Sequence, residues 1–263
     1  MEELYSLEKV EKFQWPSITG GLPAERVSIL ERHVVGEKIL DAGCGGGAYV
    51  DFLAQKGLEV TGIDKHEHFV QSAKSKGMLG NFVQGDLTCL PFSNKSFDCT
   101  YCFDVLEHID DYAAIQELTR VTSKRLIISV PREDDTLNKF NLTFLHYQDL
   151  THLRYYDVKS LKNLISSINC ESVLILPEIA VPIKELARDM IKLAPENITI
   201  KGLRTLIKIR MLNLVFKQVL AGNMPNLNSI YRESYNSFFE KLLDQASCSD
   251  IYTNLVAIID LRP

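Results

Sequence analysis

Residues 39–47 of this chain read Ile-Leu-Asp-Ala-Gly-Cys-Gly-Gly-Gly, and this stretch decides the fold. A short apolar run at 38–41 predicts a buried strand, and a helical pattern begins at Ala48. Glycines between a strand and a helix permit a tight turn and let a ligand approach the backbone closely. The stretch therefore predicts a strand, a ligand-binding turn and a helix, in that order.

The pattern of strands and helices recurs along the chain. Further strands are predicted at 58–64, 81–84, 97–103 and 125–130, with helices at 48–56, 66–76 and 110–121. The later predicted elements are a helix at 158–168, a sixth strand at 172–176 that Pro177 ends, and a last strand at 251–261. This alternation indicates an α/β fold, in which a parallel sheet carries helices on both faces.

Length and composition narrow the class of protein. The chain has 263 residues, of which 46% are hydrophobic and 24% charged, so it is not a wholly disordered chain. The 29 basic and 34 acidic residues give a net charge of −5, which disfavours a nucleic-acid partner. The first 15 residues lack the apolar core of a signal peptide, and no apolar run reaches the length of a membrane span. We therefore expect a cytoplasmic protein.

Three aspartates stand at the ends of predicted strands. Asp41 ends the first strand, where it would attract a cationic group and repel a diphosphate. Asp64 ends the second strand and can accept hydrogen bonds from both hydroxyls of a ribose, while Asp86 follows the third and can accept from an exocyclic amine. A ligand with an amine, a ribose and an adenine but no phosphate fits this set. S-adenosylmethionine has that composition.

The chain resembles the class I S-adenosylmethionine-dependent methyltransferases, in the type 11 branch that includes the ubiquinone-type enzymes. The segments that carry the resemblance are ILDAGCGGG (39–47), VTGID (60–64), FVQGDLTCLPF (82–92), SFDCTYCFDVLEHI (96–109), ELTRV (117–121) and LIISVP (126–131). The resemblance implies a Rossmann-like seven-stranded sheet, mostly parallel with an antiparallel last strand, plus a helical insertion before that strand. It also implies an enzyme that uses S-adenosylmethionine as methyl donor.

The resemblance assigns residues to the donor site. The backbone of Gly43 and Gly45 is expected to hold the methionine end, Asp64 the ribose, and Asp86 with the Leu87 N–H the adenine. The remaining residues expected at the donor are Asp41, Lys65 and Phe103, and both Phe103 and Asp104 are expected beneath the methyl donor.

Histidines supply candidate catalytic groups. Methyl transfer from a sulfonium is an in-line displacement that depends mainly on positioning, but a hydroxyl acceptor also needs a base. His108 and His152 are the candidate bases, so O-methylation is favoured over N- or C-methylation. His146, Arg154 and Tyr155 lie in an irregular segment after the fifth strand, at the sheet edge where ligands bind, and are candidates for acceptor contacts.

Three alternatives stay open at this point. Asp104, Glu107 and His108 resemble the acid-x-x-Glu-His metal-ligand set of ubiquinone-type and small-RNA 2′-O-methyltransferases, with His152 as a fourth ligand. Those enzymes have Glu at the first position, so we expect no metal here. Gly43-x-Gly45-x-x-Ala48 also fits a dinucleotide pattern, and a nicotinamide-dependent oxidoreductase is the second alternative. A non-catalytic S-adenosylmethionine-binding module is the third.

The chain is expected to divide into an N-terminal helical lid at 1–36 and a methyltransferase domain at 37–263, with a helical insertion at about 178–250. Residues 198–232 hold six basic residues and no acid in an amphipathic pattern. Such a helix can cover a hydrophobic acceptor or lie on an anionic membrane. We expect a small-molecule acceptor, hydrophobic or lipid-linked, that the segments 144–156 and 178–232 together cover. Peripheral membrane contact is the less favoured alternative.

Overall fold

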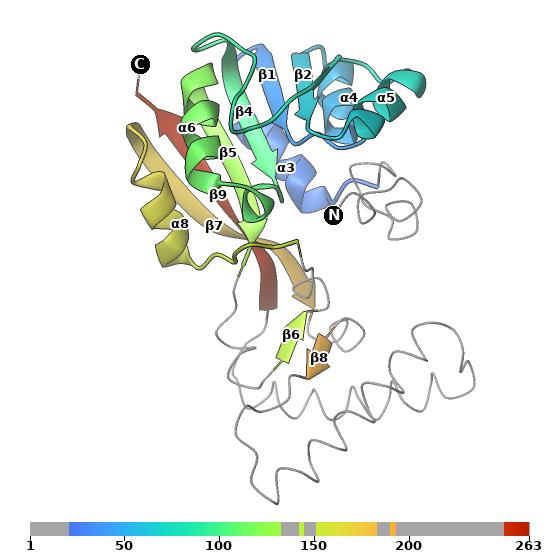
Figure 1. Ribbon diagram of the computed structural model, residues 1–263. Coiled ribbons are helices and arrows are strands. Elements are labelled where there is room, and N and C mark those ends of the chain that lie inside the picture. Colours follow the sequence, from blue (N-terminus) through green and yellow to red (C-terminus); the bar gives the residue numbers. More distant parts are fainter. Residues whose placement is uncertain (1–20, 133–141, 145–150, 183–189, 193–249, 263) are drawn as a thin grey trace, which may run out of the picture. The chain divides into compact units, whose positions relative to one another are not determined.

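A computed structural model describes residues 21–132, 142–144, 151–182, 190–192 and 250–262 (Figure 1). Contacts between residues divide the chain into two compact units. The first contains Met1–Arg132, Thr151–Ile179 and Asn254–Pro263, and the second contains Glu133–Leu150 and Ala180–Thr253. The candidate site lies within the first unit.

The first unit is built on a seven-stranded sheet in the order β3-β2-β1-β4-β5-β9-β7 (Figure 1). Its strands are β1 (Lys38–Ala42), β2 (Glu59–Asp64), β3 (Asn81–Gln84), β4 (Phe97–Phe103), β5 (Thr122–Pro131), β7 (Cys170–Pro182) and β9 (Asp250–Leu261). The pairs β1·β2, β1·β4, β2·β3 and β4·β5 are parallel, and β9 is antiparallel to β5. The order reverses at β1, which places the glycine stretch where α/β sheets bind ligands.

Helices cover both faces of this sheet. They are α3 (Ala24–His33), α4 (Ala48–Gln55), α5 (Glu67–Ser75), α6 (Asp111–Val121), α8 (Val158–Ile165) and the short 3₁₀ helix η2 (Leu106–His108). Asp110 caps α6 by accepting from Ala113 N–H, and Asp157 caps α8 in a reciprocal pair with Ser160. These caps fix where each helix begins.

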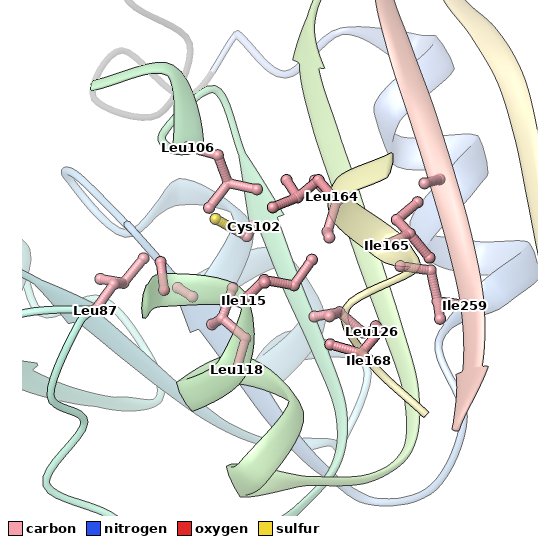
Figure 2. Packing of buried hydrophobic residues seen from close by; sticks show 14 of the residues in the cluster. Leu87, Cys102, Leu106, Ile115, Leu118, Leu126, Leu164, Ile165, Ile168 and Ile259 are labelled. Carbon is pink, nitrogen blue, oxygen red and sulfur yellow. The ribbon is translucent and has the colours of Figure 1, made fainter. Parts of the chain in front are cut away.

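Two hydrophobic clusters lie on opposite faces of the sheet. The first joins α6 and α8 to the sheet, and Figure 2 shows Leu118, Leu164 and Ile259 among its members. The second joins α3, α4 and α5 to the other face through residues such as Leu30, Leu53 and Val70. Neighbouring residues of one strand divide between the clusters, as a period of two requires. This burial on both faces holds the strand ends, and therefore the site, in fixed positions.

The second unit contains a two-stranded antiparallel sheet of β6 (Leu142–Phe144) and β8 (Met190–Lys192). Neither strand was predicted, because each is three residues long and pairs with a segment far away in the sequence. The basic amphipathic helix predicted at 198–232 lies outside the described residues. The division into a lid, a domain and a helical insertion stays a prediction.

The predicted fold class is confirmed, including the seven strands and the antiparallel last strand. The predicted end of the sixth strand at Pro177 is wrong, because β7 continues to Pro182, beyond the expected start of the insertion at 178. β7 is an edge strand of this sheet, so Pro177, which has no N–H, need not break the ladder.

Candidate functional site

The glycine turn between β1 and α4 is tied to the end of β2. Gly43 N–H and Cys44 N–H both donate to the Ile63 carbonyl, at 2.8 and 3.0 Å. Gly43 has a φ of +90°, and a Cβ there would lie 2.3 Å from Val105 Cγ2. Only glycine meets both constraints, so the backbone is left bare where a ligand would lie against it.

Asp64 fastens this turn from the end of β2. Its carboxylate accepts from Gly45 N–H at 2.9 Å on Oδ2 and from His66 N–H at 2.9 Å on Oδ1. Asp64 Oδ1 also lies 3.2 Å from His66 Nδ1. A carboxylate has about four acceptor positions, so both ribose hydroxyls can be accepted only if the His66 ring gives up this contact. The predicted ribose acceptor therefore also organises the glycine turn.

Asp41 supplies a buried carboxylate beside the turn. The residue is 4% exposed, and its Oδ2 has no hydrogen-bond partner among the described residues. Burial raises the pKa of Asp41 to about 8; the nearby Tyr101 hydroxyl opposes this rise and the charge of Asp64 adds to it. A ligand ammonium next to this carboxylate would favour its charged form. The site therefore fits a cationic ligand and disfavours a diphosphate.

Asp86 stands past the end of β3 and is partly engaged. Its Oδ1 accepts from Thr88 N–H at 2.9 Å and from Thr88 Oγ1 at 2.7 Å, and its Oδ2 lies 3.4 Å from Lys65 Nζ. The Thr88 bonds, together with Lys65, lower the pKa of Asp86. The structure thus brings the predicted residues Lys65 and Asp86 together, while the Leu87 side chain is buried in the core.

Phe103, at the end of β4, packs in an aromatic group. Its ring centroid lies 5.7 Å from that of Tyr49 and 5.3 Å from that of Tyr101, both at angles that avoid face-to-face stacking. The Arg26 guanidinium carbon lies 5.1 Å from the Phe103 centroid. Phe103 is only partly buried, so this packing leaves part of its ring open to a ligand. The contact with a ligand stays a prediction.

The structure brings His108 and His152 together, although they are far apart in the sequence. Their ring centroids are 4.6 Å apart in an edge-to-face arrangement. His108 Nδ1 lies 3.0 Å from Thr151 Oγ1 and 3.3 Å from the Thr151 carbonyl, while its Nε2 lies 3.8 Å from Glu107 Oε1. Donation from Nδ1 to the Thr151 carbonyl would leave Nε2 as the basic nitrogen.

The other acceptor candidates have different surroundings. Arg154 donates through Nη1 to the carbonyls of Leu106, at 2.9 Å, and Ile109, and it lies 3.4 Å from Asp111 Oδ1. Its guanidinium thus supports the η2 turn. Tyr155 is half-buried, with its ring centroid 5.5 Å from that of His152. His146 lies outside the described residues.

Glu107, His108 and His152 offer one ligand atom each, and these atoms all lie within 4.8 Å of one another. A carboxylate and two imidazoles suit a divalent transition ion. Asp104, the first acid of the metal-ligand pattern, is not a member of this group. Its carboxylate is bound by Arg26 at 2.6 Å and by Asn254 at 2.7 Å. The four-residue set suggested by the sequence is therefore only partly assembled.

A set of polar residues near this edge was missed by the sequence analysis. Arg26 in α3, Ser129 in β5, Glu178 in β7 and Asn254 in β9 all connect, directly or through one another, to Asp104. Arg26 and Glu178 are 6% and 2% exposed, respectively. No local motif marks them, because they meet only when α3 and three strands are in place.

The glycine turn and the strand-end acids lie within a part of the chain that matches a known protein family. A type 11 family model described as a methyltransferase domain matches residues 40–128. Residues 40–128 form a type 11, class I methyltransferase domain. Its class uses S-adenosylmethionine as methyl donor.

Curated methyltransferases are similar to part of this chain. The ubiquinone biosynthesis O-methyltransferase of Idiomarina loihiensis is 34% identical over 99 residues, which cover 34% of this chain and 40% of that protein. A probable S-adenosylmethionine-dependent methyltransferase of Mycolicibacterium smegmatis is 31% identical over 135 residues, covering 47% of this chain and 52% of the relative. The chain thus spans about half the length of the curated relatives it matches.

Solved structures share the fold of the methyltransferase domain. An S-adenosylmethionine-dependent methyltransferase from Archaeoglobus fulgidus matches with a TM-score of 0.57 and 18% identity, covering 95% of this chain and 97% of the other. A Thermotoga maritima structure, described as a possible histamine N-methyltransferase, gives a TM-score of 0.59 at 13% identity, with 100% of each chain covered. At these identities the likeness supports the fold alone.

The buried Asp41 predicts a pH dependence of stability for the methyltransferase domain without ligand. A pKa of about 8 means that the folded state keeps a proton that the unfolded state loses near pH 4. The free energy of unfolding should therefore fall as pH rises from about 4 to about 8. Each unit of difference between the folded and unfolded pKa of Asp41 changes the free energy of unfolding by about 1.4 kcal/mol, so the total loss is at most several kcal/mol. Asp41→Asn should remove that fall.

Urea unfolding at pH 5, 7 and 8.5 measures this effect. Asp41→Asn should gain stability relative to the native protein as pH rises, whereas Glu37→Gln, an exposed carboxylate just before β1, should not. Parallel pH profiles for Asp41→Asn and the native protein would contradict the prediction.

Proposed function

We propose that this protein transfers a methyl group from S-adenosylmethionine to an oxygen atom of a small molecule. The observation that carries this proposal is the joining of the glycine turn to Asp64 through the Gly45 N–H bond, at 2.9 Å, with the buried Asp41 carboxylate beside it. One side of the site can thus accept from hydroxyls and the other can neutralise a cation. A diphosphate cofactor would use the first property, through its ribose, but not the second.

The donor residues act by binding and orienting. Asp64 accepts from the ribose hydroxyls, Asp86 from the adenine amine, and the Gly43 and Gly45 backbone lies along the methionine end beside Asp41. When bound, S-adenosylmethionine supplies an electrophilic methyl group on a positively charged sulfur. Because the leaving sulfur becomes neutral, the chain needs no acid to assist departure. Its main contribution is to hold the acceptor in line with the methyl group.

His108 acts as the base for the acceptor hydroxyl in this proposal. With Nδ1 held by Thr151, His108 Nε2 would take the acceptor proton, and His152 lies edge-on against the same ring. The curated relatives named as O-methyltransferases support oxygen as the accepting atom. An acceptor bound near His108 would also lie close to Tyr155, which stacks edge-on against His152.

The acceptor class is a small molecule, and we favour a hydrophobic or lipid-linked one. No helix in the described part of the chain is long and apolar enough to cross a membrane. The cytoplasmic location and the covering of the acceptor by residues 144–156 and 178–232 stay predictions. Turnover of phenols and carboxylates, each with and without an alkyl chain, tests the acceptor class. Equal rates with and without the chain would remove the hydrophobic preference.

Donor binding is the direct test of the proposal. Isothermal titration calorimetry should show binding of S-adenosylmethionine and of its demethylated product, and none of NAD. Tight binding of NAD without donor binding would favour the oxidoreductase alternative. Donor binding without turnover of any acceptor in the panel would favour a non-catalytic binding module.

Asp64→Ala should weaken donor binding by roughly ten- to a hundredfold. The variant removes the charge-assisted hydrogen bonding to the ribose, which contributes roughly 1.5–3 kcal/mol in total, and releases the glycine turn. The matched control is Glu59→Gln, an exposed carboxylate at the opposite end of β2, which should bind the donor normally. An unchanged dissociation constant for Asp64→Ala would exclude Asp64 as the ribose acceptor.

A further inference from the structure

Arg26 joins α3 to the ends of three strands. Its Nη1 lies 2.6 Å from Asp104 Oδ2, just past β4, and its Nη2 donates to Ser129 Oγ in β5 at 3.3 Å. Its Nε lies 3.5 Å from Glu178 Oε1 in β7. The side chains of Arg26 and Glu178 are 8% and 0% exposed, so solvent screens that pair little, whereas the Asp104 side chain is 40% exposed and its pair with Arg26 is screened more. One guanidinium thus bridges two carboxylates at the carboxyl edge of the sheet.

Asp104 takes an unusual backbone conformation at this point. Its φ is +54°, in the left-handed region that residues other than glycine adopt uncommonly, although aspartate does so more often than most. Three bonds hold it there: the Arg26 ion pair, a bond from Asn254 Nδ2 at 2.7 Å, and its own N–H donating to the Ser129 carbonyl at 3.0 Å. Two of these three bonds are made by the side chain, so they depend on Arg26 and Asn254.

The conformation of Asp104 sets the direction of the chain that follows. Val105 leads directly into η2, which spans Leu106–His108 and carries the candidate base. η2 is itself short, and His108 N–H donates to the Val105 carbonyl at 3.0 Å. A change in the backbone conformation of Asp104 would therefore shift η2 and move the His108 ring, four residues later. Strained conformations of this kind persist only where the surroundings hold them.

We propose that Arg26 is a positioning residue for methyl transfer, because it holds Asp104 in the left-handed conformation that directs η2 and His108 toward the acceptor. Arg26 also pairs the Asp104 carboxylate, so this acid serves the turn rather than the group formed by Glu107, His108 and His152. The catalytic part of this inference rests on the proposed function. The conformational part concerns the protein without ligand.

The first experiment measures catalysis in Arg26→Lys and Arg26→Met. Lysine keeps the charge but cannot reach Asp104, Ser129 and Glu178 together. If Arg26→Met does not fold, Arg26→Lys alone provides the measurement. Single-turnover methylation at saturating acceptor should fall ~10–10²-fold, as expected for a misplaced catalytic group, with donor affinity unchanged. The matched control is Arg125→Met, which removes an equally paired arginine that binds Asp260 and the His33 carbonyl. This control should keep the native rate.

The second experiment separates positioning from general structural support. Glycine adopts the left-handed conformation without strain, whereas alanine does not. Asp104→Gly should therefore retain more activity than Asp104→Ala, and Asp104→Gly should restore part of the rate when combined with Arg26→Lys. The His108 ring signals in NMR spectra of the ligand-free protein should shift in Arg26→Lys and move back in the double variant.

The outcomes distinguish the two proposals. Absence of donor binding and turnover in the native protein would overturn the proposed function, while the His108 signals would still decide the positioning role. A native rate and native His108 signals in both Arg26 variants would overturn the positioning role. Equal activity of Asp104→Gly and Asp104→Ala, with no rescue of Arg26→Lys, would also overturn it.

Discussion

Replacing His108 by alanine should slow methyl transfer by ~10²–10⁴-fold while leaving the affinity for S-adenosylmethionine unchanged. The reason is the separation of roles within the site. The donor contacts lie on the glycine turn, Asp64 and Asp86, whereas His108 contacts Thr151 and faces His152. Without the imidazole, no base would remove the proton from the acceptor hydroxyl as its oxygen attacks the methyl carbon. Single-turnover rates and calorimetric donor affinity, measured side by side, test this expectation.

The control and a second variant sharpen this test. His33→Ala changes a histidine whose backbone carbonyl binds Arg125, and it should transfer methyl at the native rate. His152→Ala, measured separately, shows which ring is the base. Native rates for both His108→Ala and His152→Ala would leave these histidines as structural residues and would favour an acceptor that needs no base.

The same assay bears on the metal alternative. Glu107, His108 and His152 could hold a divalent ion, which would polarise the acceptor oxygen instead of an imidazole removing its proton. Incubation with a chelator should leave the rate unchanged if His108 acts as the base. Loss of activity with chelator, restored by Mg²⁺ or Zn²⁺, would contradict our expectation of no metal.

Replacing Gly47 by alanine should destabilise the domain by about 2–5 kcal/mol and abolish measurable donor binding. Gly47 precedes α4 with a φ of +83°, and a Cβ there would lie 2.4 Å from Phe82 Cε1 and 3.2 Å from Ala73 Cβ. The left-handed conformation costs an L-residue roughly 1–2 kcal/mol, and overpacking of a core typically costs about 1–3 kcal/mol more. The glycine turn would have to move away from β3 to relieve the contact.

Gly57→Ala provides a control for the backbone contribution. Gly57 has a φ of +87°, but nothing lies within 4 Å of a Cβ added there. The two variants therefore share the strain of the left-handed conformation and differ in the steric clash. Thermal unfolding and donor titration of both variants measure that difference. Equal losses of stability and intact donor binding in Gly47→Ala would show that the turn tolerates the added methyl group.

Most of the sheet could be predicted because its signals are local. β3 and β4 have the predicted ends, and β1, β2 and β5 agree with the predictions within a few residues. Apolar runs that end in a turn residue mark buried strands without reference to the rest of the chain. The error at Pro177 has a tertiary origin, since the position of β7 at the sheet edge decides whether a proline interrupts it.

The candidate site was predictable only in part, for the same reason. The glycine turn, Asp41 and Asp64 lie in short continuous motifs, and the structure brings them together. The contact of His108 with His152 requires the segment after β5 to return to η2, where Leu153 N–H donates to the Glu107 carbonyl at 2.7 Å. Arg26 carries no motif at all. Its role depends on α3, β4, β5 and β7 meeting at one point.

The placement of β9 between β5 and β7 affects when the sheet can form during synthesis on the ribosome. β5 pairs with the strand that is made last of all the described strands, and the Arg125–Asp260 bond spans 135 positions of sequence. Contacts of such long range slow folding, since a large loop must close before they form. β7 emerges well before the neighbour that joins it to the sheet. Asn254, which holds Asp104, arrives on that same neighbour. The edge of the sheet that carries the proposed chemistry can therefore be completed only after β9 has been synthesised.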